Sequence, residues 1–392
     1  MTVGRRRNNT MRTRLFYLLV LASLVMAACG PVAATEAPPA AAPTGAVAAA
    51  TQAGEAPAAA ATEAVDPVVL ALQLADKAAR GESVELSGES GVTIGIVMPA
   101  LDNDGWRAIY IGALGKAIEL GANVITLDAR DKVENQLAMI EDMITQEVDA
   151  IVFVPVDSAA MSAAVVKANE AGIPVIAMDR STQGGDVAAL VESNNVEIGR
   201  TGADLMAEVA DEFGVAIEDL KILELLGDLA TSAGQERHEG FSTRGQELGF
   251  NVVAELPTYW QADKANAAVL DAFAANPDIN AIYMASGCAM YTGVESAMRS
   301  LGNFIPRDEV GHIMLISTDG CPAPLEAMRG GYVDADSAQQ LLTMGMEAIA
   351  AAFAAAQGGA PESPIIRLGP DPIRPDNVDD PFHWANAINT AY

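Results

Sequence analysis

The chain has 392 residues, a formal net charge of −29 and only three cysteines. A surface this acidic argues against nucleic acid as a partner, because nucleic-acid binding needs a basic footprint. The three histidines are scattered and no CxxC motif occurs, so we expect no metal site, no thiol catalyst and no cofactor. The body from about Pro67 to Tyr392 is too long for one ordinary core and predicts two domains.

The N-terminus has the pattern of an export signal. Five arginines precede an apolar run that ends at Cys29, as in the n-region and h-region of a signal peptide. The run is shorter than the roughly 20 apolar residues of a membrane span. Its end, Met26-Ala-Ala-Cys-Gly30, resembles the lipobox of bacterial lipoproteins, which implies lipidation of Cys29. We expect residues 1–29, starting at Met1 or Met11, to be a lipoprotein signal peptide.

A low-complexity segment follows the lipobox. From Pro31 to Asp66 the chain is almost only Ala, Pro, Thr, Glu and Gly, with no Lys, Arg or aromatic residue. Such a composition buries too little apolar surface to offset the entropy of ordering. We therefore expect residues 30–66 to form a disordered tether between the membrane-anchored Cys29 and the folded body of an exported protein.

The next hundred residues alternate between strand and helix patterns. Amphipathic helical spacing marks segments such as Lys132–Thr145 and Ala159–Ala171. The strands have near-continuous apolar runs, which suit a parallel sheet covered on both faces. They are expected at Val92–Met98, Asn123–Leu127, Ala150–Val154, Pro174–Met178 and Val187–Val191.

The pattern then restarts with a helix near Val196–Phe213. Helical segments again separate the strands that follow it. Two successive sets of this kind predict an α/β fold with two doubly wound parallel-sheet lobes and right-handed crossovers. The strands of the second set are expected at Lys221–Leu225, Val252–Leu256, Ala281–Ala285, Ile313–Ile316 and Val333–Ala335.

Polar and aromatic side chains follow most of these strands. In open parallel sheets, ligands bind beyond the carboxyl ends of the strands. Carboxylates, amides and guanidinium groups can pair with neighbouring hydroxyls, and indole faces can cover the C–H face of a ring. The set predicts a site for a small, uncharged, hydroxyl-rich molecule. Its members are Asn103, Trp106, Asp179, Arg180, Arg237, Trp260, Ser286, Asp319 and Gln339.

Four segments carry a resemblance to a known family. From about Val92 onward the chain resembles the ribose- and galactose-type periplasmic binding proteins of bacterial ABC sugar importers. The matching segments are Met98–Trp106, Gly172–Arg180, Ala230–Phe241 and Ser317–Gly320. The resemblance implies a type I periplasmic binding protein that closes on a monosaccharide, acts as a monomer and delivers its ligand to an ABC permease and its ATPase subunit. It also implies that the positions of Asn103, Trp106, Asp179, Arg180, Arg237, Trp260, Asp319 and Gln339 line the sugar site.

The resemblance further implies a three-strand hinge. The chain would cross between lobes near Ser193–Asn195, Gln339–Leu341 and Arg367–Gly369. The N-terminal lobe would then comprise residues 67–193 plus 341–367, and the C-terminal lobe residues 194–340 plus 368–392. The tail from Pro372 looks like an extension that some members carry.

Two departures from the family concern the identity of the ligand. Ser286 and Val154 stand where ribose-type members often carry Asn. Shorter side chains leave room for a larger or differently configured ligand, or for bridging water. We expect an aldose or related polyol of pentose or hexose size, with D-ribose not the best ligand.

Cys288 and Cys321 are expected to form a disulfide. Each lies two residues beyond a proposed ligand residue, Ser286 or Asp319, at the ends of successive strands. If those strands are adjacent, the two loops lie within bridging range. Two buried free thiols are the alternative.

The sequence bears on three other functions. No GxSxG, Walker A, GxGxxG or HExxH motif occurs, so no enzyme template fits and we expect no catalytic residue. A sugar-responsive repressor would need a basic helix-turn-helix where this chain has an export signal. A third role, presenting ligand to a chemoreceptor or sensor kinase, stays open beside transport.

Overall fold

The computed structural model describes residues 67–82 and 84–388. The lipidation site Cys29, the signal peptide 1–29 and the tether 30–66 lie outside the described residues. Within the described part of the chain, no helix is long and apolar enough to span a membrane.

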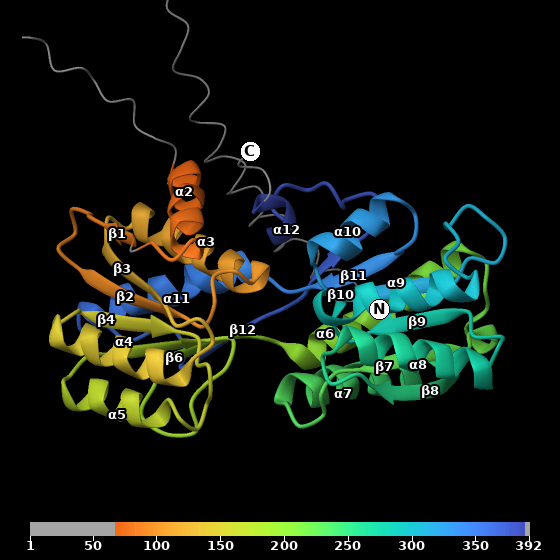
Figure 1. Cartoon of the computed structure of the whole chain (residues 1–392), viewed down its shortest axis with the longest axis horizontal. Helices are drawn as coiled ribbons and strands as arrows, with labels where there is room; N and C mark the ends of the chain where they lie inside the picture. The colour runs from red at the N-terminus through yellow and green to blue at the C-terminus, as the bar shows by residue number, and fades with distance from the viewer. Residues whose placement is uncertain (1–66, 83, 389–392) are drawn as a thin grey trace, which may run out of the picture. The chain divides into compact units, whose positions relative to one another are not determined.

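The N-terminal lobe is built on a seven-stranded sheet in the order β1-β3-β2-β4-β5-β6-β12 (Figure 1). Only β1 runs antiparallel, against β3 at the sheet edge. The strands are β1 (Val84–Leu86), β2 (Thr93–Met98), β3 (Asn123–Asp128), β4 (Ala150–Phe153), β5 (Val175–Met178), β6 (Ala189–Ser193) and β12 (Ile365–Leu368).

Helices cover both faces of this sheet. Alternate residues of a strand point to opposite faces, so Val152 packs with one group of helices and Ile151 with the other. The first group is α2 (Pro67–Ala79), α3 (Asp104–Glu119) and α11 (Leu341–Ala356), and the second is α4 (Val133–Thr145) and α5 (Ser162–Glu170).

The C-terminal lobe has a six-stranded sheet in the order β13-β11-β10-β9-β7-β8. Its strands are parallel except β13, which pairs antiparallel with β11. They are β7 (Ile222–Leu226), β8 (Val252–Pro257), β9 (Ala281–Met284), β10 (Met314–Asp319), β11 (Ala335–Ala338) and β13 (Asp371–Ile373).

In this lobe α6 (Asn195–Glu212) and α7 (Ser232–Leu248) pack together beside the sheet, and α6 lies against β9, β10 and β11. A second layer holds α8 (Ala262–Ala275), α9 (Gly287–Leu301) and α10 (Pro322–Arg329). A 3-10 turn, η1 (Ile217–Asp219), and a short helix near the C-terminus, α12 (Trp384–Ala387), complete the described elements.

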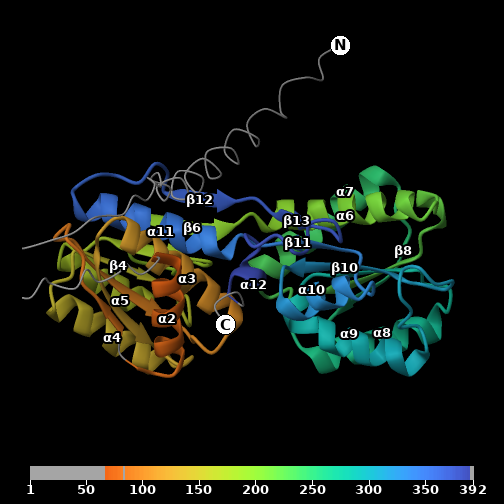
Figure 2. The ribbon, with the colours of Figure 1, turned by 90° about the horizontal axis from the view of Figure 1, so that it is seen from above.

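The chain passes between the two sheets at three places. These are the connections from β6 to α6, from β11 to α11 and from β12 to β13 (Figure 2). Hydrogen bonds join the crossing segments: the Ser193 hydroxyl donates to Gln339 Oε1 at 2.7 Å, and Gln340 Nε2 donates to the Gly369 carbonyl at 2.9 Å. Three short connections tied side by side form a natural hinge.

The fold class expected from the sequence is confirmed: two α/β lobes with mainly parallel sheets. The expectation missed α2, β1, β13 and the strand character of β12, and it placed β11 at 333–335 instead of 335–338. Asp336 and Ser337 explain the misplacement of β11, because both are polar and yet fully buried in the sheet. A strand interior with such residues gives no apolar run to detect.

Candidate functional site

Arg237 is the centre of a buried polar cluster in the C-terminal lobe. It lies on α7, whose first turn is capped by the Thr231 hydroxyl, and only 5% of its surface is exposed. Nη1 donates to Asp319 Oδ1 and to the Ala285 carbonyl, both at 2.7 Å, and Nε donates to Asn195 Oδ1 at 2.9 Å. The guanidinium is therefore held from three sides.

Asp319 ends β10 and accepts hydrogen bonds from three separate parts of the chain. Gln339 Nε2 donates to Oδ1 at 2.8 Å, beside the bond from Arg237, and the Ser286 hydroxyl donates to Oδ2 at 2.5 Å. Its φ of +89° lies in the left-handed region, which a side chain other than glycine occupies only when the surroundings hold it there. Such strain is common at ligand sites.

Trp260 forms a flat wall beside this cluster. Its φ is +57°, and its indole lies on Gly227, directly after β7, so closely that a Cβ on Gly227 would fall 1.9 Å from the ring. The Arg237 guanidinium carbon lies 5.9 Å from the ring centroid. Glycine at 227 is therefore what admits the indole.

A similar group stands at the strand ends of the N-terminal lobe. The Arg180 guanidinium carbon lies 5.3 Å from the Trp106 ring centroid, and Arg180 Nε donates to Asp179 Oδ2 at 3.2 Å. Asp179 directly follows β5 and has a φ of +63°. The Arg180 side chain is 45% exposed, so it is accessible to a ligand.

Asn103 lies at the start of α3 and supports this second group. Its Oδ1 accepts from the backbone N–H groups of Gly105 and Trp106, at 2.9 and 3.2 Å. That helix cap uses the carbonyl oxygen of the side chain and fixes the turn from which Trp106 projects.

The nine residues expected from the sequence thus fall into two groups. The structure brings Arg237, Trp260, Ser286, Asp319 and Gln339 together in the C-terminal lobe, and the remaining four at strand ends of the N-terminal lobe. Gln339 also accepts from Ser193 across two crossing segments. A ligand that touches both groups would join the lobes.

Sequence reasoning missed three residues around Asp319. Asn195 lies two residues beyond the end of β6 and satisfied the strand-end rule, so that signal was available. Asp336 accepts from the Gly320 N–H at 2.9 Å from inside β11, and burial raises its pKa from the usual 3.8 to about 7. Trp384 donates to the Asp319 backbone carbonyl at 2.7 Å from the tail, where no pattern pointed to it.

Cys288 and Cys321 are joined as a disulfide, with their Cα atoms 5.4 Å apart. Their strands, β9 and β10, are neighbours in the sheet, which is the adjacency that the pairing requires. One ligand atom each of Cys288, Cys321 and Asp319 lies within 4.8 Å of the others. Since the sulfurs are bonded together and the carboxylate is paired with Arg237, this cluster does not fit a metal site.

Comparison with known proteins agrees with this architecture. The sequence profile of the periplasmic binding protein domain matches residues 94–360. The ribose import binding protein RbsB of Salmonella typhimurium is 32% identical over 247 residues, covering 63% of this chain and 79% of the relative. The D-allose-binding periplasmic protein of Escherichia coli is 26% identical over 275 residues, covering 68% and 85%.

Among solved structures, a periplasmic ribose ABC transporter protein from Conexibacter woesei superposes with a TM-score of 0.66. The match covers 75% of this chain and 95% of that chain at 21% identity, so it supports the fold alone. The family profile spans well over half of the sequence. The chain therefore belongs to the periplasmic binding protein family.

Proposed function

We propose that the protein is the substrate-binding component of an ABC sugar importer and binds a monosaccharide between its lobes. The observation that carries this is a repeated arrangement. Each lobe presents an indole with a guanidinium near its ring, and an aspartate in the left-handed region: Trp106, Arg180 and Asp179 in one, Trp260, Arg237 and Asp319 in the other.

This chemistry suits a sugar ring. Two indoles can cover its two apolar faces, while the carboxylates and guanidinium groups pair with hydroxyls at its rim. A ligand that touches both lobes binds the closed arrangement better and shifts the population toward it. The three crossing segments support a division into lobes of residues 67–193 plus 341–367 and residues 194–340 plus 368–392.

The ligand we propose is an aldose or related polyol of pentose or hexose size, and not D-ribose. The relatives named above are described as binding ribose or allose. Here the Ser286 hydroxyl already donates to Asp319 and accepts from the Ala289 N–H. The Val154 carbonyl accepts from the buried Gln136 amide. Neither position offers a ligand the long amide arm of an asparagine.

The remaining parts of the proposal concern the cell. We expect an exported monomer anchored through lipidated Cys29 on the outer face of the cytoplasmic membrane or in the periplasm. Its partners would be an ABC permease and its ATPase subunit, and it would release the sugar chemically unchanged.

A thermal-shift screen tests the proposed ligand class, because a ligand that binds only the folded state must raise the apparent stability. The panel comprises pentoses, hexoses, polyols, nucleosides and amino acids. The expected result is the largest shift with an aldose or polyol. A largest shift with D-ribose would refute the interpretation of Ser286 and Val154, and a shift only with a nucleoside or amino acid would refute the sugar assignment.

A further inference from the structure

The segment from Arg374 to Ile388, here called the C-terminal strap, folds back onto the C-terminal lobe after β13. Arg329 of α10 anchors it by donating to Asp379 Oδ1 at 2.7 Å and to Asn386 Oδ1 at 2.8 Å. His383 ties the strap to the start of β13 through Asp371 Oδ2 at 2.8 Å. The strap is thus a fixed part of the lobe.

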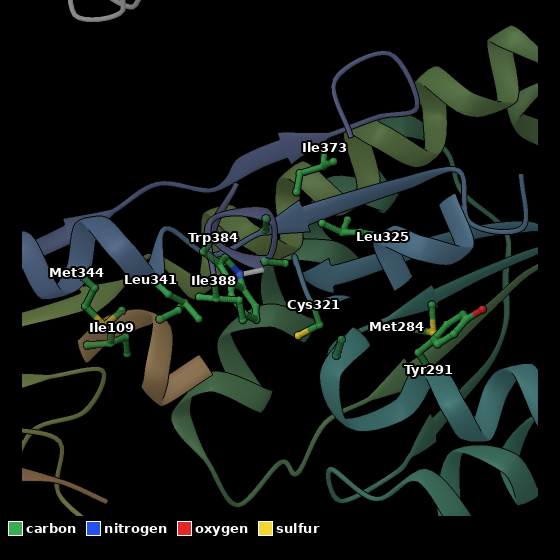
Figure 3. Close-up of a cluster of buried hydrophobic side chains, with 14 of the residues drawn as sticks. Ile109, Met284, Tyr291, Cys321, Leu325, Leu341, Met344, Ile373, Trp384 and Ile388 are labelled. Atoms are coloured by element: carbon green, nitrogen blue, oxygen red, sulfur yellow. The ribbon is translucent and has the colours of Figure 1, made fainter. Parts of the chain in front are cut away.

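Trp384 is the strap residue that reaches the candidate site. Only 3% of it is exposed, and its indole Nε1 donates to the backbone carbonyl of Asp319 at 2.7 Å. In the view of Figure 3, Trp384 and Ile388 stand between Leu341 on one side and Cys321 on the other. No side-chain group of Asp319 takes part in this bond, so its carboxylate stays available to Arg237, Ser286 and Gln339.

The backbone around Asp319 needs such support. Asp319 and Gly320 have consecutive positive φ values of +89° and +77°. Gly320 adopts a positive φ freely because it has no Cβ, whereas Asp319 does so at an energetic cost and persists there only when neighbouring groups hold it. Gly320 also permits the close approach, because a Cβ there would lie 3.1 Å from the indole nitrogen and 2.6 Å from the Ala338 Cβ. Trp384 therefore holds the residue whose carboxylate the site depends on.

The indole is itself held in place. α12 packs against α3 of the N-terminal lobe, and Trp384 and Ile388 belong to the same buried cluster as Ile109 and Leu341. A group that positions another must have its own conformation fixed by packing. Residues of α3 and α11 supply that packing to the indole.

We propose that Trp384 is a positioning residue for ligand binding: its Nε1–H bond to the Asp319 carbonyl keeps the carboxylate in its binding orientation. The inference rests on the proposed function, since it concerns the same site. It assigns a role in binding to the C-terminal strap, a part of the chain outside the strand-end set.

The test compares Trp384→Phe, which removes the N–H but keeps an aromatic ring, with Ile388→Ala as the matched control. Ile388 is equally buried and lies at the end of the same helix, but it makes no bond to Asp319. A second variant replaces Trp384 with benzothienylalanine, which keeps the indole shape and lacks only the N–H. It preserves the test if the phenylalanine variant does not fold.

Two readouts are taken well below the unfolding temperature. Amide hydrogen exchange in the peptide covering Asp319–Cys321 should become at least about tenfold faster in the Trp384 variants and stay near wild type in Ile388→Ala. The Kd for the best sugar of the panel should rise about five- to tenfold in the Trp384 variants only. A lower melting temperature common to all the variants does not bear on the result.

Unchanged exchange and Kd in the Trp384 variants would overturn the proposal. Equal effects in Ile388→Ala would also overturn it, because they would show a general contribution of strap packing. If wild-type protein binds no sugar, the proposed function fails separately, and the exchange readout still decides whether Trp384 holds the loop.

Discussion

Replacing Arg237 by methionine should destabilise the C-terminal lobe, because it leaves a buried carboxylate without its counter-charge. Asp319 is only 4% exposed, and breaking a buried ion pair by removing one partner costs about 3–5 kcal/mol. Gln339 and Ser286 still donate to Asp319 in the variant, so the lower figure applies. A loss of about 3 kcal/mol corresponds to a melting temperature lower by roughly 6–12 °C.

The control for this prediction is the double variant Arg237→Met with Asp319→Asn, which removes both charges. Urea unfolding followed by circular dichroism should show that the double variant recovers part of the lost stability, with a coupling energy of about 2 kcal/mol. If the two single effects simply add, the ion pair does not stabilise the lobe and the reasoning is refuted.

Four further changes test other parts of the structure. Gly227→Ala should displace the Trp260 indole and weaken sugar binding about tenfold in calorimetry, and wild-type affinity would show that the indole does not form the site. Arg180→Ala should likewise weaken binding about tenfold or more, since a sugar hydroxyl enclosed between the lobes would lose its guanidinium partner. Burial raises the pKa of Asp336 to about 7, so its contribution to stability is greatest below about pH 4 and is lost as the pH rises to 7. Asp336→Asn should remove this loss of stability between pH 4 and 7 in urea melts, and a variant with the wild-type pH profile would contradict the prediction. Intact mass without reductant should show two hydrogens fewer than the reduced chain, and a mass equal to that of the dithiol would exclude the bridge. Cys288 and Cys321 are 33 positions apart, so reduction of their disulfide should lower the free energy of unfolding by roughly 3–4 kcal/mol.

The sequence was informative about the sheets because their strands are short apolar runs separated by amphipathic helices. β9, with Ala281–Met284 entirely buried, is typical. The strand-end rule was informative about the site for a related reason, since Asp179 and Trp260 each come at or just beyond the end of a parallel strand. Periodicity was sufficient for the central strands, and position along the chain was sufficient to place these polar residues at strand ends.

Other features depend on contacts between distant segments and leave no local pattern. The tryptophan at 384 lies 65 residues beyond Asp319, yet bonds to its backbone. Asp336 looks like a surface residue in sequence and is fully buried in β11. The close approach of Gly227 to the Trp260 ring joins β7 to the residues after β8. Only the packed structure shows which of these groups come together.

We propose that one sugar is held by groups from both lobes and draws them together about the three crossing segments. Small-angle X-ray scattering of the wild-type protein, with and without a saturating amount of the best sugar of the panel, tests it most directly. We expect a smaller radius of gyration with sugar and no change for Asp319→Asn at the same concentration. An unchanged radius of gyration in wild-type protein at full saturation would contradict it.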